Sequence, residues 1–179
     1  MDHREQVAHH EAAHAVMALI VRHGLSHHGM DIDAPSSVPG ATGQTGVMTF
    51  AADLTQPEAD QFKDLGALLA VTLAGAAADA RIKGVSLWDA LQAQPGDLGV
   101  AQGFCAEYPF ARGPDEAMAL QMGLEIAEKR LAWPGAWDAV CAVAASCLAA
   151  GGKLTKAEIE AVALPILDIE GPVGLTTAP

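Results

Sequence analysis

Long runs of apolar and helix-favouring residues, broken by short Gly- and Pro-containing segments, predict a mainly α-helical fold. Residues 3–23 are rich in Ala, Glu, Leu and Met, and Gly24 is the expected stop of this first helix. A second helix is predicted from a cap at Thr55 to a stop near Gly84, and its segment 68–80 is apolar nearly all round. We therefore expect that segment to lie buried in the middle of the fold.

Shorter elements fill the rest of the chain. A linker is predicted at 85–96. Further helices are predicted after it, at 97–108, 114–133, 134–150 and 155–162. Two pieces read as extended, GMDID at 29–33 and GVMTF at 46–50, and they either pair as a hairpin or belong to a small sheet. The expected fold class is therefore mainly α with a small β-hairpin or sheet.

Length and charge limit the function classes. The 179 residues fit one domain, expected at 1–165, followed by a loose Pro- and Gly-containing tail at 166–179. Ten Lys and Arg stand against 22 Asp and Glu, which gives a formal net charge of −12. Such a surface repels phosphate backbones, so we expect no nucleic-acid partner.

Membrane and export signals are also not expected. The apolar run at 12–21 is preceded by Glu5 and Glu11 and has no small-residue cleavage site after it. The run at 65–78 is shorter than the roughly 20 residues that a membrane crossing needs. The chain has 3 cysteines without C-x-x-C spacing, which favours reduced thiols and a cytoplasmic location.

The candidate chemistry is concentrated in His10-Glu11-Ala12-Ala13-His14, an H-E-x-x-H motif inside the first predicted helix. At about 100° per residue, His10 and His14 lie about 400° apart, so both imidazoles project from one face and can reach one metal ion. Glu11 lies beside that face, where it can act as the general base for a metal-bound water. The competing interpretation is a chance match, because all seven histidines fall in the first 28 residues.

A zinc peptidase needs a third protein ligand. The extended motif with a glycine and a third histidine is excluded, because Met17 and Ile20 occupy those positions. A carboxylate from a distant segment remains, and spacing alone does not choose among Asp31, Asp33, Asp60, Asp64, Asp79, Asp89 and Asp97. Manganese, iron or cobalt could occupy the same kind of site.

The run VAHHEAAHAVMA resembles the active helix, A-x-H-E-A-G-H-A, of the protease domain of the FtsH family of zinc metalloproteases. Other segments resemble the same domain in the same order. They are GVMTF, LAGAAADARIKG at 73–84, PGDLGVAQ at 95–102 and LTKAEIEAV at 154–162. The resemblance spans roughly residues 3–163, and it implies an FtsH-like helical protease fold.

The resemblance also implies roles for individual residues. The metal ligands of the family fall on His10, His14 and Asp97, its general base falls on Glu11, and the implied cofactor is Zn²⁺. Asp79 matches an acidic position of the family's long helix, where it either holds an imidazole N–H or is a plain helix-surface charge. The implied activity is hydrolysis of peptide bonds in unstructured or extended polypeptides.

Departures from the family leave a second function open. Ala13 replaces the family's glycine, and the chain contains no G-x-x-x-x-G-K-[ST] string of an ATPase module. We therefore expect ATP-independent cleavage, unless a separate ATPase chain acts in trans, and homo-oligomers are a further expectation from the ring-forming family. The alternative is a catalytically inactive module of the same fold that binds peptides or a protein partner.

Overall fold

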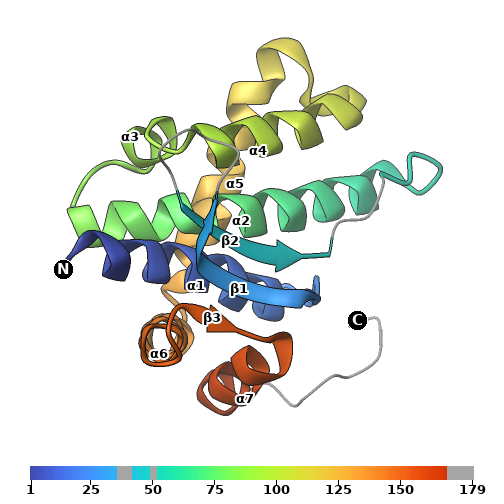
Figure 1. The fold of residues 1–179 in the computed structure, drawn as a ribbon. Helices are drawn as coiled ribbons and strands as arrows, with labels where there is room; N and C mark the ends of the chain where they lie inside the picture. Colours follow the sequence, from blue (N-terminus) through green and yellow to red (C-terminus); the bar gives the residue numbers. More distant parts are fainter. Residues whose placement is uncertain (36–41, 49–51, 169–179) are drawn as a thin grey trace.

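The computed structural model describes residues 1–35, 42–48 and 52–168. Its described part contains seven α-helices and three strands (Figure 1). The helices are α1 (His3–Ile20), α2 (Glu58–Lys83), α3 (Leu87–Gln92), α4 (Pro95–Glu107), α5 (Glu116–Leu131), α6 (Ala136–Ala149) and α7 (Lys156–Leu167). The strands are β1 (Leu25–Pro35), β2 (Thr42–Val47) and β3 (Lys153–Leu154), and two short 3₁₀ turns, Pro109–Ala111 and Gly113–Asp115, precede α5. The mainly helical class with a small sheet is confirmed.

The three strands form one antiparallel sheet in the order β2-β1-β3, so β2 is an edge strand. Met30 of β1 pairs with Thr45 of β2 on one side and with Leu154 of β3 on the other. The strand predicted at 46–50 is shifted, because β2 occupies 42–47, and residues 49 and 50 lie outside the described part of the chain. The polar and glycine-rich sequence TGQTGV has no apolar alternation, which is why the pattern missed its first half.

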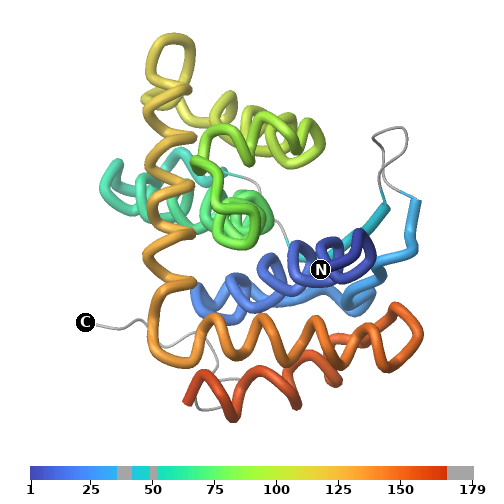
Figure 2. The backbone as a smooth tube through the Cα atoms, turned by 90° about the vertical axis from the view of Figure 1, so that its left-hand side faces the viewer, coloured from blue at the N-terminus to red at the C-terminus, as the bar shows by residue number. Residues whose placement is uncertain are grey.

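Helix α1 lies at the centre of the fold, between the sheet, α2 and α6 (Figures 1 and 2). One buried core surrounds α1 and includes side chains from the sheet, α6 and α7. A second core gathers the middle of α2 with α4 and α5. Helix α2 contributes to both cores, so it joins the two halves of the molecule.

The start of α1 follows its sequence closely. The Asp2 side chain accepts from the Glu5 backbone N–H at 2.8 Å, and the Glu5 side chain accepts from the Asp2 N–H at 2.8 Å, which makes a capping box. The helix ends at Ile20, three residues before the predicted end. The chain turns there through Arg22 at φ 56° and Gly24 at φ 83°, both left-handed.

Helix α2 has the length and hydropathy of a membrane-crossing helix, but 78% of its most apolar window is buried inside the fold. The predicted burial of its second half is therefore confirmed. Gly84 ends the helix in the left-handed conformation, as expected. Thr55 does not cap the helix; it donates to Asp53 Oδ1 at 2.6 Å, and Pro57 is the N-cap residue.

Several other boundaries differ from the prediction. The segment 85–96 is not a plain linker, because Ser86 accepts from the Asp89 N–H and caps the short helix α3. Helix α6 begins at Ala136, since Gly135 adopts a left-handed conformation that separates it from Pro134. Helix α7 continues through Leu167, so residues 166 and 167 are helical, and residues 169–179 lie outside the described part.

Candidate metal centre

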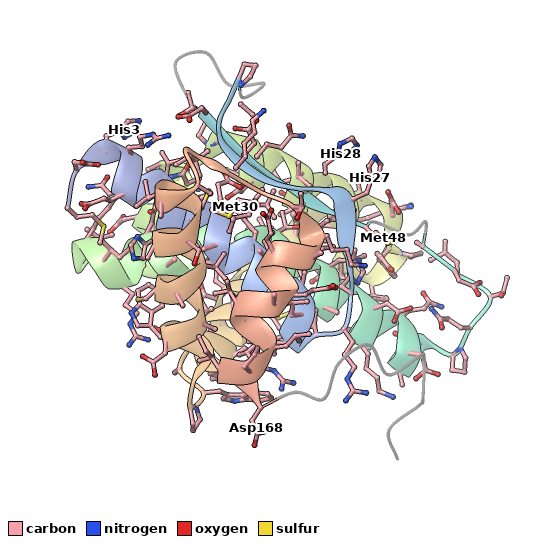
Figure 3. All side chains as sticks on the ribbon, turned by 60° about the horizontal axis from the view of Figure 1, so that its bottom comes forward. His3, His27, His28, Met30, Met48 and Asp168 are labelled. Atoms are coloured by element: carbon pink, nitrogen blue, oxygen red, sulfur yellow. The ribbon has the colours of Figure 1, made fainter. Side chains whose placement is uncertain are left out.

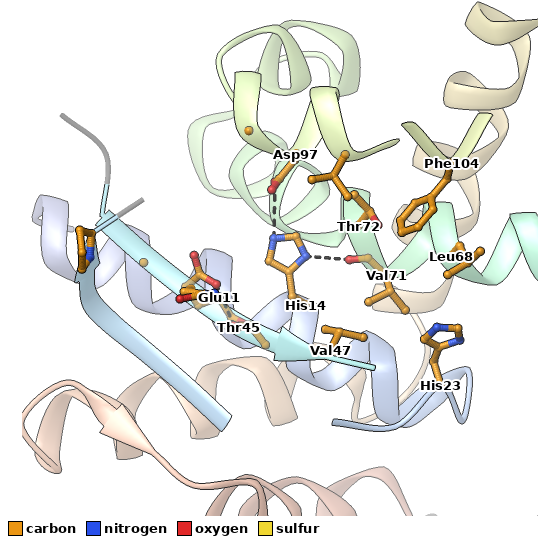
Figure 4. Close-up of a pocket in the computed structure, with 15 residues that line it drawn as sticks. Glu11, His14, His23, Thr45, Val47, Leu68, Val71, Thr72, Asp97 and Phe104 are labelled. Carbon is orange, nitrogen blue, oxygen red and sulfur yellow. Dashed lines mark hydrogen bonds and ion pairs between the residues drawn. The ribbon is translucent and has the colours of Figure 1, made fainter. Parts of the chain in front are cut away.

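Three predicted ligand atoms converge where the middle of α1 meets the first turn of α4. Figure 4 shows two of these ligands, His14 and Asp97, facing each other. The Nε2 atoms of His10 and His14 are 3.2 Å apart. Asp97 Oδ2 lies 3.2 Å from His10 Nε2 and 3.4 Å from His14 Nε2. Residues 87 positions apart in sequence are thus brought together by the packing of α2 against both helices.

These separations fit a single zinc ion. Ligands held tetrahedrally at about 2.0–2.1 Å from zinc lie about 3.3–3.4 Å from one another. Asp97 Oδ2 is buried and makes no hydrogen bond within the described residues, although it lies between two imidazoles. Two imidazole nitrogens and one carboxylate oxygen are also the donor set of many catalytic zinc sites, which keep a fourth position for water.

The far side of each imidazole contacts a group of α2, through a hydrogen bond at His14 and through a longer ion contact at His10. His14 Nδ1 donates to the Val71 carbonyl oxygen at 2.7 Å, so its Nε2 presents a lone pair to the centre. His10 Nδ1 faces Asp79 Oδ2 at 3.6 Å, the contact expected if Asp79 orients the ring. Asp79 is in turn held by Lys83 Nζ at 3.0 Å and Gln94 Nε2 at 2.7 Å.

The electrostatics of the centre favour a cation. Burial lowers the pKa of His10, but Asp79 and Asp97 outweigh it and raise that pKa to about 10. The pKa of His14 is also raised, mainly by Asp97 against the opposing effect of burial. Burial raises the pKa of Asp97, yet the two imidazoles lower it well below its usual range. The carboxylate charges that raise these pKa values also attract a divalent metal ion, which must displace the proton from each imidazole when it binds.

Gly75 of α2 leaves the room that the two imidazoles need. A Cβ at this position would collide with His10 Nε2 and would lie 2.5 Å from His14 Nε2. The glycine in LAGAAADA therefore serves the metal centre directly, and no periodicity in the sequence indicates this. Helix α2 thus shapes the centre through a missing side chain, through the Val71 carbonyl and through Asp79.

Glu11, the predicted general base, projects from α1 toward β2 and is 6% exposed. Thr45 Oγ1 lies 2.7 Å from Glu11 Oε2, to which it donates, and 2.9 Å from the Glu11 carbonyl oxygen. A Cβ at Gly43 would lie 2.5 Å from Glu11 Oε1. Sequence reasoning missed both contacts, because they depend on the register of an edge strand that the pattern placed too late.

An open cleft of about 370 Å³ lies beside the ligands (Figure 4). Glu11, His14 and Asp97 form its polar end, and Thr45 and Val47 of β2 form one wall. Its apolar wall comes from three elements and consists of Val47, Leu68, Val71, Val100 and Phe104. The cleft therefore combines a reactive polar end with an apolar surface, the usual composition of a small ligand site. Sequence reasoning did not identify these apolar residues as a site.

The other histidines do not join the centre. His9 Nδ1 donates to the Glu5 carbonyl at 2.8 Å, and the exposed rings of His27 and His28 contact each other at a tilt of 39°, with centroids 3.9 Å apart. Figure 3 shows His27 and His28 together on one face and His3 at the start of α1. Within the residues that the structure describes, His10, His14 and Asp97 form the one group of three potential ligands.

Comparisons with models of known families, with curated proteins and with solved structures each gave no match. A function is therefore inferred from the geometry of the candidate centre and of the cleft beside it.

Proposed function

We propose that this protein is a zinc-dependent endopeptidase with an FtsH-like protease fold, which hydrolyses peptide bonds in extended or unfolded polypeptides. The observation that carries the proposal is the convergence of His10, His14 and Asp97 with Glu11 beside them at the end of an open cleft. The order of elements supports the FtsH-like assignment. The motif helix comes first, then the hairpin, then the long helix with Asp79, and then Asp97 in the first turn of α4.

The mechanism needs two functions from the chain. His10, His14 and Asp97 would hold the zinc, which when bound polarises the scissile carbonyl and lowers the pKa of a water toward about 7. Glu11 accepts a proton from that water while the water oxygen forms its bond to the carbonyl carbon. Glu11 then returns the proton to the amine nitrogen as the C–N bond breaks, so the base ends in its starting state.

The cleft also indicates how substrate binds. The free edge of β2 can pair with an extended segment through main-chain hydrogen bonds, which are tolerant of sequence. The apolar wall formed by residues such as Leu68, Val71 and Phe104 would then accept a substrate side chain. We therefore expect extended peptides with an apolar residue next to the cleaved bond to be the better substrates.

The test is hydrolysis of quenched fluorescent peptides by the zinc-loaded chain and its Glu11→Gln variant. Loss of the base should lower kcat by about 10²- to 10⁴-fold while zinc content stays unchanged. Glu125→Gln, an exposed glutamate on α5, is the matched control and should keep wild-type activity. Unchanged hydrolysis in Glu11→Gln would contradict the mechanism. A zinc-loaded wild type that binds these peptides without cutting them would identify the chain as a peptide-binding module instead.

A further inference from the structure

The buried carboxylate of Glu11 is fixed between two residues of β2. Thr45 Oγ1 donates to Oε2 at 2.7 Å, and Gly43 lies against Oε1, where a Cβ would approach to 2.5 Å. Gly43 also has φ +108°, a backbone conformation that residues other than glycine rarely adopt. The two strand residues therefore have different effects, since Thr45 donates to one oxygen and the missing side chain of Gly43 leaves room for the other.

Strand pairing fixes the position from which Thr45 acts. Thr45 pairs with Met30 of β1, and Met30 is 1% exposed and pairs on its other side with Leu154. The Thr45 hydroxyl also lies 2.9 Å from the Glu11 backbone carbonyl, so it contacts the helix and the side chain at once. Its position relative to α1 is therefore set by the sheet and not by a flexible side chain alone.

A fixed carboxylate matters for proton transfer. A glutamate has three side-chain torsions, and a base must lie within about 2.6–3.2 Å of the proton that it removes. A hydrogen bond to a charged oxygen is stronger than one to a neutral oxygen, and it holds the carboxylate in one orientation. With Oε2 held by Thr45, the oxygen left for the water proton is Oε1.

We propose that Thr45 is a positioning residue that holds Glu11 for proton abstraction through Oε1, with Gly43 keeping that oxygen accessible. This inference rests on the proposed peptidase function. The proton balance is unchanged, since the O–H bond of the water breaks, the proton passes to Oε1, and it later leaves with the amine. Thr45 itself neither gains nor loses a proton overall.

The test compares Thr45→Val, which keeps the shape and strand propensity without the hydroxyl, with Thr45→Ser, which keeps the hydroxyl. In the zinc-loaded chain, we expect Thr45→Val to lower kcat about tenfold or more, with KM within about twofold of wild type. Thr45→Ser should recover kcat to within about threefold of wild type. Zinc content, measured on the same samples, should match wild type in both variants, whereas the Tm of Thr45→Val should be lower than that of Thr45→Ser, because Glu11 loses its donor.

The outcomes separate this inference from the proposed function. A wild-type kcat in Thr45→Val, with Glu11→Gln inactive, overturns the role of Thr45 and leaves the peptidase intact. An equal loss of kcat in Thr45→Val and Thr45→Ser also overturns the role of Thr45, because the shape of the side chain and not its hydroxyl would then matter. A loss of zinc in Thr45→Val also contradicts it, since the effect would lie in the metal centre. Full activity in Glu11→Gln, or no cleavage by zinc-loaded wild type, overturns both proposals.

Discussion

Helices α1 and α4 supply the two halves of the candidate metal centre, and they differ in how they are held. Ten of the 18 residues of α1 are buried, including His10, Glu11 and His14. Helix α4 has 13 residues, of which only Ala101 and Cys105 are buried. The α1 half is therefore built into the core, whereas the α4 half lies on the surface of the second core.

A contact at the start of α4 compensates for this difference. Gln94, the N-cap residue of α4, donates to Asp79 of α2 at 2.7 Å, and Asp79 faces His10. The same carboxylate thus faces an imidazole of α1 and accepts a hydrogen bond from the end of the helix that carries Asp97. In this candidate centre, one half is fixed by burial and the other is placed by a few polar contacts.

The two halves should differ most in how much each contributes to the free energy of unfolding of the metal-free chain. His14→Ala removes a buried imidazole and leaves the Val71 carbonyl without its donor, which we expect to cost about 2–4 kcal/mol. Asp97→Ala removes a carboxylate that is 24% exposed and whose contacts with the Nε2 atoms of His10 and His14 are 3.2 and 3.4 Å long, so its cost should be smaller, about 1–2 kcal/mol. Urea unfolding in a chelator measures both variants. Equal costs would contradict a buried α1 half and a peripheral α4 half.

Adding a methyl group at a glycine should have opposite effects on stability beside the imidazoles and on the exposed face of α4. Gly75→Ala on α2 places a Cβ against both imidazoles, so we expect about 1–3 kcal/mol of destabilisation and a weakened zinc affinity. Gly99→Ala on α4 meets nothing within 4 Å, and it should stabilise the helix by about 0.5–1 kcal/mol. Thermal unfolding and zinc titration check both variants. Normal zinc affinity in Gly75→Ala would show that the imidazoles do not need this space.

A smaller effect, on zinc affinity, is expected when Asp79, which contacts both halves, is changed. Asp79→Asn keeps the shape but removes the charge beside His10, and it should weaken zinc binding about 10- to 100-fold. Asp60→Asn is the control on the same helix, because Asp60 pairs only with exposed Lys63 and should leave zinc affinity unchanged. Competition with a chelating indicator measures both affinities. An Asp79→Asn variant with wild-type affinity would reduce Asp79 to a structural ion pair.

The sequence predicted the α1 half better than the rest. The helix-favouring composition, the helical spacing of His10 and His14, and the H-E-x-x-H string are local features, so they can be recognised without knowledge of the fold. Asp97 could not be chosen from seven candidate aspartates by spacing, because its approach to His10 depends on how α4 packs on α2. Only the resemblance indicated it, and the structure brings the three residues together.

The sheet was the weakest part of the prediction. A strand of the sequence TGQTGV has no apolar alternation, and β3 has only two residues. The shift of β2 from 46–50 to 42–47 is what hid the contacts of Gly43 and Thr45 with Glu11. Side-chain contacts that depend on register between distant segments are inaccessible to a one-dimensional pattern.

Zinc content, measured by elemental analysis of the purified chain after zinc addition and removal of unbound metal, tests the central claim most directly. The account predicts about one zinc per chain in wild type and in His28→Ala, an exposed histidine away from the centre. It predicts almost none in His14→Ala and in Asp97→Ala. A wild type that holds no zinc, or an Asp97→Ala variant that holds as much as wild type, would contradict the proposed centre.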